Sequence, residues 1–184
     1  MKVRQFLLLI LPLTLVLVSC NSREKLMNEK IRSLVDMAEL GTVEYTVKKI
    51  IKAEDCVWYK FGDRKILFSS VAYLKAGIDL KDFSMDDVHF DLRNHTVTVT
   101  LPKAKLLAFN MPEEEINQEY CNVSGFRQSF SIQEREALKK QAEESILADV
   151  PKMGILQDAE RNASDFFNAM FAGLGFRQIT VNFR

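Results

Sequence analysis

The sequence contains one cluster of acidic and imidazole side chains whose spacing could bind a metal ion. Asp87, His89 and Asp91 alternate with apolar residues, so in an extended strand all three would project from one face. Imidazole and carboxylate groups are ligands that suit zinc or manganese. No second histidine is placed to complete such a ligand set, and any solvated strand face shows the same alternation. The pattern therefore allows two interpretations, a metal site and the wet face of an ordinary strand.

A cysteine near the start of the chain predicts a different chemistry, the attachment of lipid. Two cations and an apolar run over residues 6–18 precede Cys20, and this run is shorter than the ~18 residues that a membrane-spanning helix needs. The pattern is typical of a signal peptide over residues 1–19. Leu17 and Ser19 before the cysteine resemble the lipobox, at which bacterial lipoprotein precursors are cut after the thiol has been lipidated.

From this pattern we expect Cys20 to carry acyl chains such as palmitate, which would anchor the mature chain to a membrane without spanning it. An ordinary secretory signal and an uncleaved anchor remain the alternatives. The leader places the protein in the bacterial cell envelope and leaves open which membrane holds it.

Cys56 and Cys121 remain once Cys20 is lipidated. Because an exported compartment can be oxidising, one prediction is a disulfide between Cys56 and Cys121. The alternative is a pair of free thiols, since unpaired cysteines are common in protein interiors.

An aromatic pair, Trp58 and Tyr59, lies just before an expected turn at Gly62 and Asp63. Exposed, the two rings could form a patch for a glycan, a lipid or another protein. Packed inward, they would cover the edge of a hydrophobic core. The sequence supports both interpretations.

Hydrophobic periodicity indicates that these residues sit on a mixture of helices and strands. The Ser131-to-Glu134 spacing matches a capping box, which marks the start of a helix. Gly41 is expected to end the first helix. The predicted helices cover residues 23–40, 131–150 and 155–174, and the predicted strands cover residues 42–52, 64–74, 88–92, 97–101 and 178–184.

The strands at 88–92 and 97–101 predict a hairpin with a defined register. A turn at Arg93 and Asn94 would place Phe90 opposite Val97 on an apolar face, and Val88 opposite Val99 beside them. His95 would then lie at the turn. Neither histidine lies in a serine or cysteine nucleophile motif, so the sequence gives no positive sign of an enzyme.

The charges of the chain are balanced, with 25 cationic and 25 acidic residues. This balance gives no indication of a nucleic-acid partner. After the leader, residues 20–40 read as a lipidated cysteine, a short stub and a helix, and residues 41–184 read as a single domain.

Four segments of the chain resemble a known family, the domain of unknown function 4230, which occurs in bacterial membrane-anchored proteins. The resemblance extends over about residues 39–184 and is carried by residues 39–51, 62–68, 71–80 and 96–107. It implies an uncharacterised envelope domain and brings neither a known reaction nor catalytic residues.

These observations predict an α+β fold, in which a largely antiparallel sheet is covered by the N-terminal helix and two C-terminal helices and includes a final C-terminal strand. We expect a non-enzymatic binding or scaffold module without a cofactor, whose partner is an envelope protein or a glycan. A metal-assisted hydrolase using Asp87, His89 and Asp91 and an accessory subunit of a transport assembly are the alternatives.

Overall fold

The computed structural model describes residues 25–37, 39–55 and 61–184 of the chain. They form two compact units, each assembled from separate stretches of sequence. Unit 1 contains the described residues before Leu40 together with Leu80–Pro102 and Phe166–Arg184, and unit 2 contains Leu40–Asp79 and Lys103–Asp165. The single domain expected over residues 41–184 stays a prediction beside this division.

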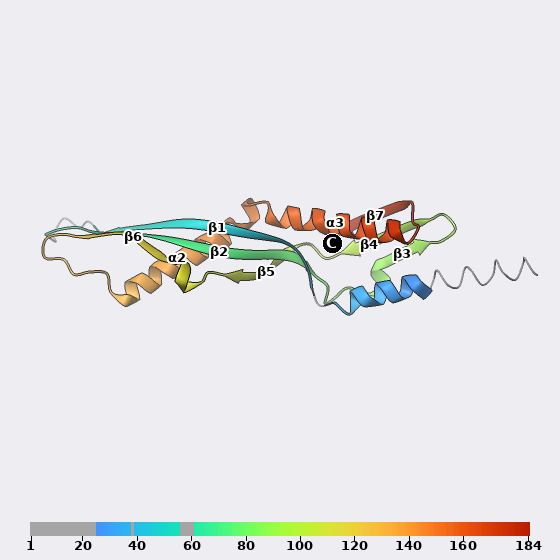
Figure 1. Ribbon diagram of the computed structural model, residues 1–184, viewed down its shortest axis with the longest axis horizontal. Coiled ribbons are helices and arrows are strands. Elements are labelled where there is room, and N and C mark those ends of the chain that lie inside the picture. Colours follow the sequence, from blue (N-terminus) through green and yellow to red (C-terminus); the bar gives the residue numbers. More distant parts are fainter. Residues whose placement is uncertain (1–24, 38, 56–60) are drawn as a thin grey trace, which may run out of the picture. The chain divides into compact units, whose positions relative to one another are not determined.

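Unit 2 is built around one long strand, β2 (Arg64–Asp79), in a sheet that has four strands among the described residues (Figure 1). On one side β2 pairs with β1 (Glu39–Asp55). On its other side it pairs antiparallel with β5 (Lys105–Asn110) near its end and with β6 (Asn117–Val123) near its beginning. The short elements β5 and β6 thus share one edge of β2.

Strands β1 and β2 lie side by side as a long hairpin. Asp55 at the end of β1 bonds Arg64 at the start of β2. At the other end, a side chain on Gly77 would collide with the Leu40 carbonyl and approach the Cα atom of Gly41. The prediction that Gly41 ends a helix is therefore wrong, because this glycine lies inside β1, where the two backbones come too close for a side chain. The preceding helix covers described residues 25–35.

Helix α2 (Ile132–Asp149) begins with the capping box that its sequence predicts. The Ser131 hydroxyl accepts a hydrogen bond from the Glu134 N–H, and the Glu134 carboxylate accepts one from the Ser131 N–H. The helix passes into the 3₁₀ turn η3 (Val150–Lys152), which contains Pro151, and α3 (Ile155–Gly173) follows. The helix boundaries therefore agree with those predicted to within a few residues.

Strand β1 is tied to the two helices by its polar side chains. The Tyr45 hydroxyl donates to the Asp158 carboxylate at 2.5 Å, and Lys49 pairs with Asp149 at 3.1 Å. The apolar cluster of this unit joins the sheet to the segment before α2. Its buried members are Ile66, Phe68 and Phe130, and partly buried Ile51, Ala53, Ile116 and Leu138 pack against them.

Unit 1 contains a sheet of three strands among the described residues: β3 (Val88–Asp91), β4 (Thr96–Leu101) and β7 (Gln178–Phe183). Strands β3 and β4 pair antiparallel, with Val88 opposite Val99 and Phe90 opposite Val97, which confirms the predicted register. Strand β7 is the predicted final strand, and it pairs parallel to β4.

The core of unit 1 is rich in aromatic side chains. Phe167 and Phe171 on the second half of α3 are fully buried, with ring centroids 6.2 Å apart, and Phe83 and Phe176 extend the cluster on either side.

The helices and strands described above confirm the α+β class. Within the described ranges, no helix has the length and apolarity that crossing a bilayer requires.

Candidate binding surface

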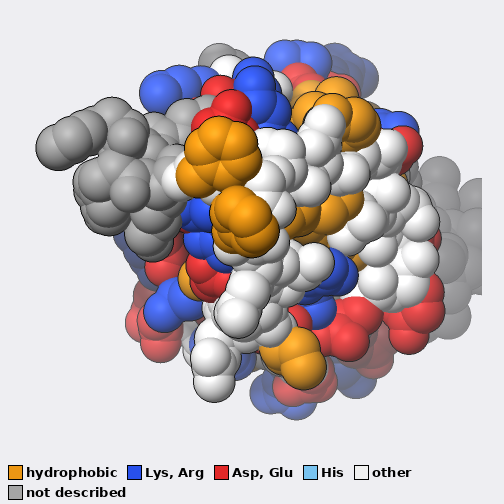
Figure 2. Space-filling view, turned by 90° about the vertical axis from the view of Figure 1, so that its left-hand side faces the viewer, with side chains coloured by type: hydrophobic (Ala, Val, Ile, Leu, Met, Phe, Trp, Pro, Cys, Tyr) orange, Lys and Arg blue, Asp and Glu red, His pale blue; other side chains and the backbone are white. Residues whose placement is uncertain are grey.

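The most unusual surface feature of unit 2 is a pair of exposed phenylalanines at one end of its sheet. Phe61 precedes β2 and Phe126 follows β6, and their side chains are 77% and 92% exposed. Their rings lie 6.0 Å apart between centroids, at an angle of 44°. We call Phe61–Asp63 and Ser124–Phe126 the aromatic tip. Figure 2, which views the end that lies on the left in Figure 1, shows hydrophobic side chains at the surface with charged groups beside them.

Two glycines allow the backbones of the aromatic tip to lie against each other. Gly62 has a φ of 100° and Gly125 a φ of 64°, the left-handed region that glycine adopts without strain. A side chain on Gly62 would collide with the Ser124 carbonyl, and one on Gly125 would reach the Phe61 carbonyl. Both positions therefore require glycine for conformation and for space.

Backbone groups join the two halves of the aromatic tip. The Ser124 N–H donates to the Asp63 carbonyl at 2.9 Å, and the Asp63 N–H donates to the Ser124 hydroxyl at 2.9 Å. A longer bond of 3.4 Å runs from the Phe126 N–H to the Phe61 carbonyl. The positions of the two rings are thus fixed by paired backbones.

Burial along this loop is the reverse of what the residue types would favour. The side chain of Arg127 is 6% exposed, whereas its neighbour Phe126, taken as a whole residue, is 92% exposed. Arg127 forms an ion pair with Asp55, yet its Nη1 atom is buried and has no hydrogen-bond partner among the described residues. Burying a guanidinium and exposing a phenyl ring is unfavourable for folding, so the arrangement suggests a role outside folding.

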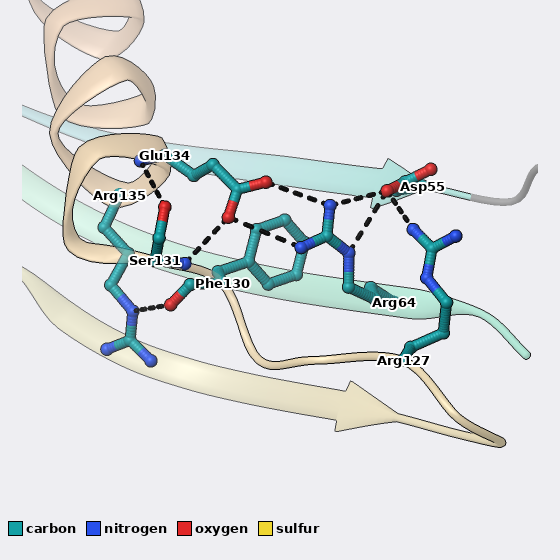
Figure 3. A network of polar contacts seen from close by, with 7 residues as sticks. All are labelled: Asp55, Arg64, Arg127, Phe130, Ser131, Glu134 and Arg135. Carbon is teal, nitrogen blue, oxygen red and sulfur yellow. Dashed lines mark hydrogen bonds and ion pairs between the residues drawn. The ribbon is translucent and has the colours of Figure 1, made fainter.

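An ion network holds the loop that carries Phe126 against the sheet (Figure 3). Arg64 donates to Asp55 at 2.6 and 3.1 Å and to the Glu134 carboxylate at 2.9 and 3.4 Å. Its guanidinium also lies over the Phe130 ring, 4.7 Å from the centroid. Asp55 accepts from Arg127 as well as from Arg64, so one carboxylate links β1, β2 and the loop.

The electrostatics of this network favour its charged form. The hydrogen bond from Arg64 to Asp55 raises the pKa of the Arg64 guanidinium most, and the one from Arg64 to Glu134 raises it further. The Ser131 N–H and Arg64 lower the pKa of Glu134 from 4.5 to about 2. The same glutamate caps α2 and pairs with Arg64, so it couples the helix start to the ion network.

The aromatic tip is chemically suited to binding. Exposed aromatic rings on a rigid scaffold supply apolar contact area at little cost in conformational entropy, and aromatic residues are enriched at the centres of interfaces. Other large apolar side chains of this unit are exposed too, among them Tyr120 on β6 by 50%, Ile50 on β1 by 62% and Ile132 at the start of α2 by 80%. The described side chains of the tip supply contact surface and no nucleophile paired with a base.

The predicted metal ligands occupy three different settings. The prediction that Asp87 lies on the strand is wrong, because this residue ends the 3₁₀ turn η1 (Met85–Asp87). Its carboxylate accepts hydrogen bonds from Arg184 and from the Ser84 N–H, and these lower its pKa. His89 is exposed on β3. Asp91 accepts bonds from the N–H groups of the following turn.

Within the described ranges, no group of three or more histidine, cysteine, aspartate and glutamate side chains is arranged to hold a metal ion. Asp87, His89 and Asp91 share a stretch of chain but engage separate partners. The metal site stays a prediction. His95 lies at the turn as expected, with a φ of 54°, and its carbonyl accepts from the N–H groups of Arg177 and Gln178.

The remaining predicted site residues lie largely outside the described ranges. This applies to Cys20, the lipidation site, and to Trp58 and Tyr59, the predicted ligand patch. It also applies to Cys56, while Cys121 is exposed on β6 opposite Ile66. The disulfide and the lipid anchor therefore stay predictions.

Sequence reasoning did not single out Phe61, Phe126 or the ion network. The available signal was the pairing of a phenylalanine with a glycine at both positions, Phe61 with Gly62 and Gly125 with Phe126. Each pair reads alone as an ordinary loop. Only the approach of two segments distant in sequence brings the rings together.

A scan against family models matches residues 32–181 to a protein of unknown function, DUF4230. This range agrees closely with the extent of the resemblance seen in the sequence. The comparisons with curated proteins and with solved structures gave no match.

Proposed function

The chain belongs to the DUF4230 family of proteins of unknown function, and from this premise we propose that it is a lipid-anchored binding module of the bacterial cell envelope. Cys20 would hold it at a membrane, and the aromatic tip would contact a second component of the envelope. The module acts by binding and scaffolding and catalyses no reaction of its own.

One observation carries the binding role: Phe61 and Phe126 are held outward by a backbone arrangement that needs two glycines and a buried arginine. Each of these features makes the fold harder to form. Local structure that conflicts with folding is expected where function requires it. The lipid anchor is supported by the leader and by the cysteine that follows it.

Photo-cross-linking in intact cells tests this proposal. A benzophenone-bearing phenylalanine analogue replaces Phe126 in one form of the full-length chain and Ile50 in a control form, Ile50 being 62% exposed on β1. We expect an adduct from position 126 and much less from position 50. Membrane fractionation of the same cells should recover the native chain with the membranes.

A Cys20→Ala form provides the second arm of this experiment. It should lose lipoprotein processing, and the position-126 adduct should weaken because the chain is no longer anchored beside its partner. Equal labelling from positions 126 and 50 would contradict a binding role for the aromatic tip. Unchanged processing of the Cys20→Ala form would contradict the anchor.

A further inference from the structure

We propose that the envelope component bound by the aromatic tip is a lipid bilayer, into which Phe61 and Phe126 insert their rings. This inference rests on the proposed function and specifies its partner.

The two rings of the tip present a hydrocarbon surface. A phenyl ring carries no donor or acceptor, unlike the indole and phenol rings that combine an apolar face with a polar group. Polar backbone groups beside the two rings already bond across the tip, from Ser124 to Asp63 and from Phe126 to Phe61. Sites for sugars and peptides need placed polar groups to fix the orientation of the ligand. A bilayer needs none.

Among the described residues, the charged side chain of the tip itself is the exposed carboxylate of Asp63, and the arginines of the neighbouring ion network are paired with carboxylates. Arg127 pairs with Asp55, and Arg64 pairs with Asp55 and with Glu134. The side chains of both arginines are largely buried, 6% exposed for Arg127 and 15% for Arg64. A tip that recognised an anionic surface would keep its cations in water. Insertion should therefore be driven by apolar burial and should be insensitive to salt.

The size of the tip also favours a bilayer over a protein. Two phenylalanines bury about 150–250 Å² each, whereas each partner in a stable protein interface buries about 800 Å². A bilayer rewards small insertions, since each phenyl ring moved from water into an apolar phase changes the partition constant by about tenfold or more. Held rigidly by two glycines, the rings lose little further freedom on insertion.

Quenching by brominated lipid tests the proposal on the full-length chain. Phe126→Trp is combined with Trp58→Phe, which removes the natural tryptophan, and the protein is reconstituted into phosphatidylcholine vesicles with and without bromine on the acyl chains. The matched control combines Ile50→Trp with Trp58→Phe, because Ile50 is exposed on β1 of the same unit. Both substitutions place indole at an exposed site, so folding is little affected.

We expect brominated lipid to quench the Phe126→Trp form several-fold more strongly than the Ile50→Trp form, equally in low and in high salt. Equal quenching of the two forms would overturn bilayer insertion, and so would a difference that disappears in salt. Vesicle flotation of the same samples distinguishes membrane anchoring of the chain from insertion of the tip.

Proteins that float with the vesicles but show no excess quenching at position 126 would leave the lipid-anchored module standing and reject only the bilayer as the partner of the tip. In that case a protein adduct or a glycan adduct from the cross-linker at position 126 would identify the partner instead. Proteins that do not float would reject both the anchor and bilayer insertion.

Discussion

Two regions outside the strands, the β3–β4 turn of unit 1 and the aromatic tip of unit 2, use opposite kinds of side chain. In the turn, the Asp91 carboxylate accepts from the N–H of Arg93 at 2.8 Å and from the N–H of Asn94 at 3.2 Å. In the tip, glycines supply the left-handed backbone and phenylalanines face the solvent. The Asp91 carboxylate thus accepts hydrogen bonds within the turn. The phenyl rings of the tip accept and donate none.

The polar residues of the turn serve the fold, whereas the exposed rings of the tip are candidates for binding. In the sequence, Asp87, His89 and Asp91 have the spacing of a possible metal site. In the structure, Asp87 caps a 3₁₀ turn and Asp91 closes a hairpin. The aromatic tip attracts none in the sequence, yet it exposes what folding would bury. Internally satisfied polar groups need no further explanation, while rigidly exposed rings do.

The largest expected effect of a substitution is at the centre of the ion network. Arg64→Ala should lower the free energy of unfolding by about 2–3 kcal/mol, because it leaves Asp55 and Glu134 without the cation they share. Urea unfolding measures this change. Arg93→Ala in the β3–β4 turn is the control and should change stability by about 0.5 kcal/mol or less. Similar effects of both substitutions would mean that the two regions are built alike.

The next largest effect is expected at the close approach within the tip. Gly125→Ala should cost about 2 kcal/mol, since the new methyl group is strained at a φ of 64° and meets the Phe61 carbonyl. Gly154 also has positive φ, of 80°, but no atom lies within 4 Å of where its methyl group would be. Gly154→Ala should therefore cost about 1 kcal/mol, the conformational part alone. Equal losses in thermal or urea unfolding would show that contact across the tip is unimportant.

Acid should weaken unit 2 through Glu134. The folded protein holds the pKa of this carboxyl at about 2, below its usual 4.5, so its ionised form stabilises the fold. That contribution is complete above pH 4.5 and declines as the pH falls from there through about 2. Glu134→Gln should be less stable than the native chain at neutral pH, and its stability should fall less steeply in this acid range. Parallel pH profiles of unfolding would exclude Glu134 as the group responsible.

A smaller effect is expected in the β3–β4 turn. Asp91→Ala should lower stability only slightly, because two backbone N–H groups lose their acceptor but remain close to water. His89→Ala, on the exposed face of the neighbouring strand, should have almost no effect on stability.

The metal prediction is tested on the Asp91→Ala and His89→Ala variants, by measuring zinc bound per purified chain. Stoichiometric zinc that both substitutions remove would restore these residues as a site.

Much of the fold follows from local pattern. The Ser131–Glu134 capping box, the Val88–Val99 register and the final strand are all set by neighbouring residues or by side-chain alternation, and the structure confirms them. The role of Gly41 was misread because a glycine at a helix end and a glycine beneath a neighbouring strand look identical in sequence. Its reason lies in Gly77, which is distant along the chain.

The candidate site was less predictable for the same reason. Phe61 and Phe126 lie in loops whose sequences are unremarkable, and Arg127 would be placed at the surface by its type alone. Their importance arises from contacts that join β1, β2 and the loop before α2 through Asp55. No periodicity encodes such contacts.

The fold holds the Phe61 and Phe126 rings outward and gains little stability from them. Urea unfolding of the Phe61→Ser/Phe126→Ser double variant measures what the two rings contribute. With the side chains 77% and 92% exposed, we predict a free energy of unfolding within about 0.5 kcal/mol of the native value. A loss of about 2 kcal/mol or more would contradict this expectation, because it would show that the rings are part of what holds unit 2 together.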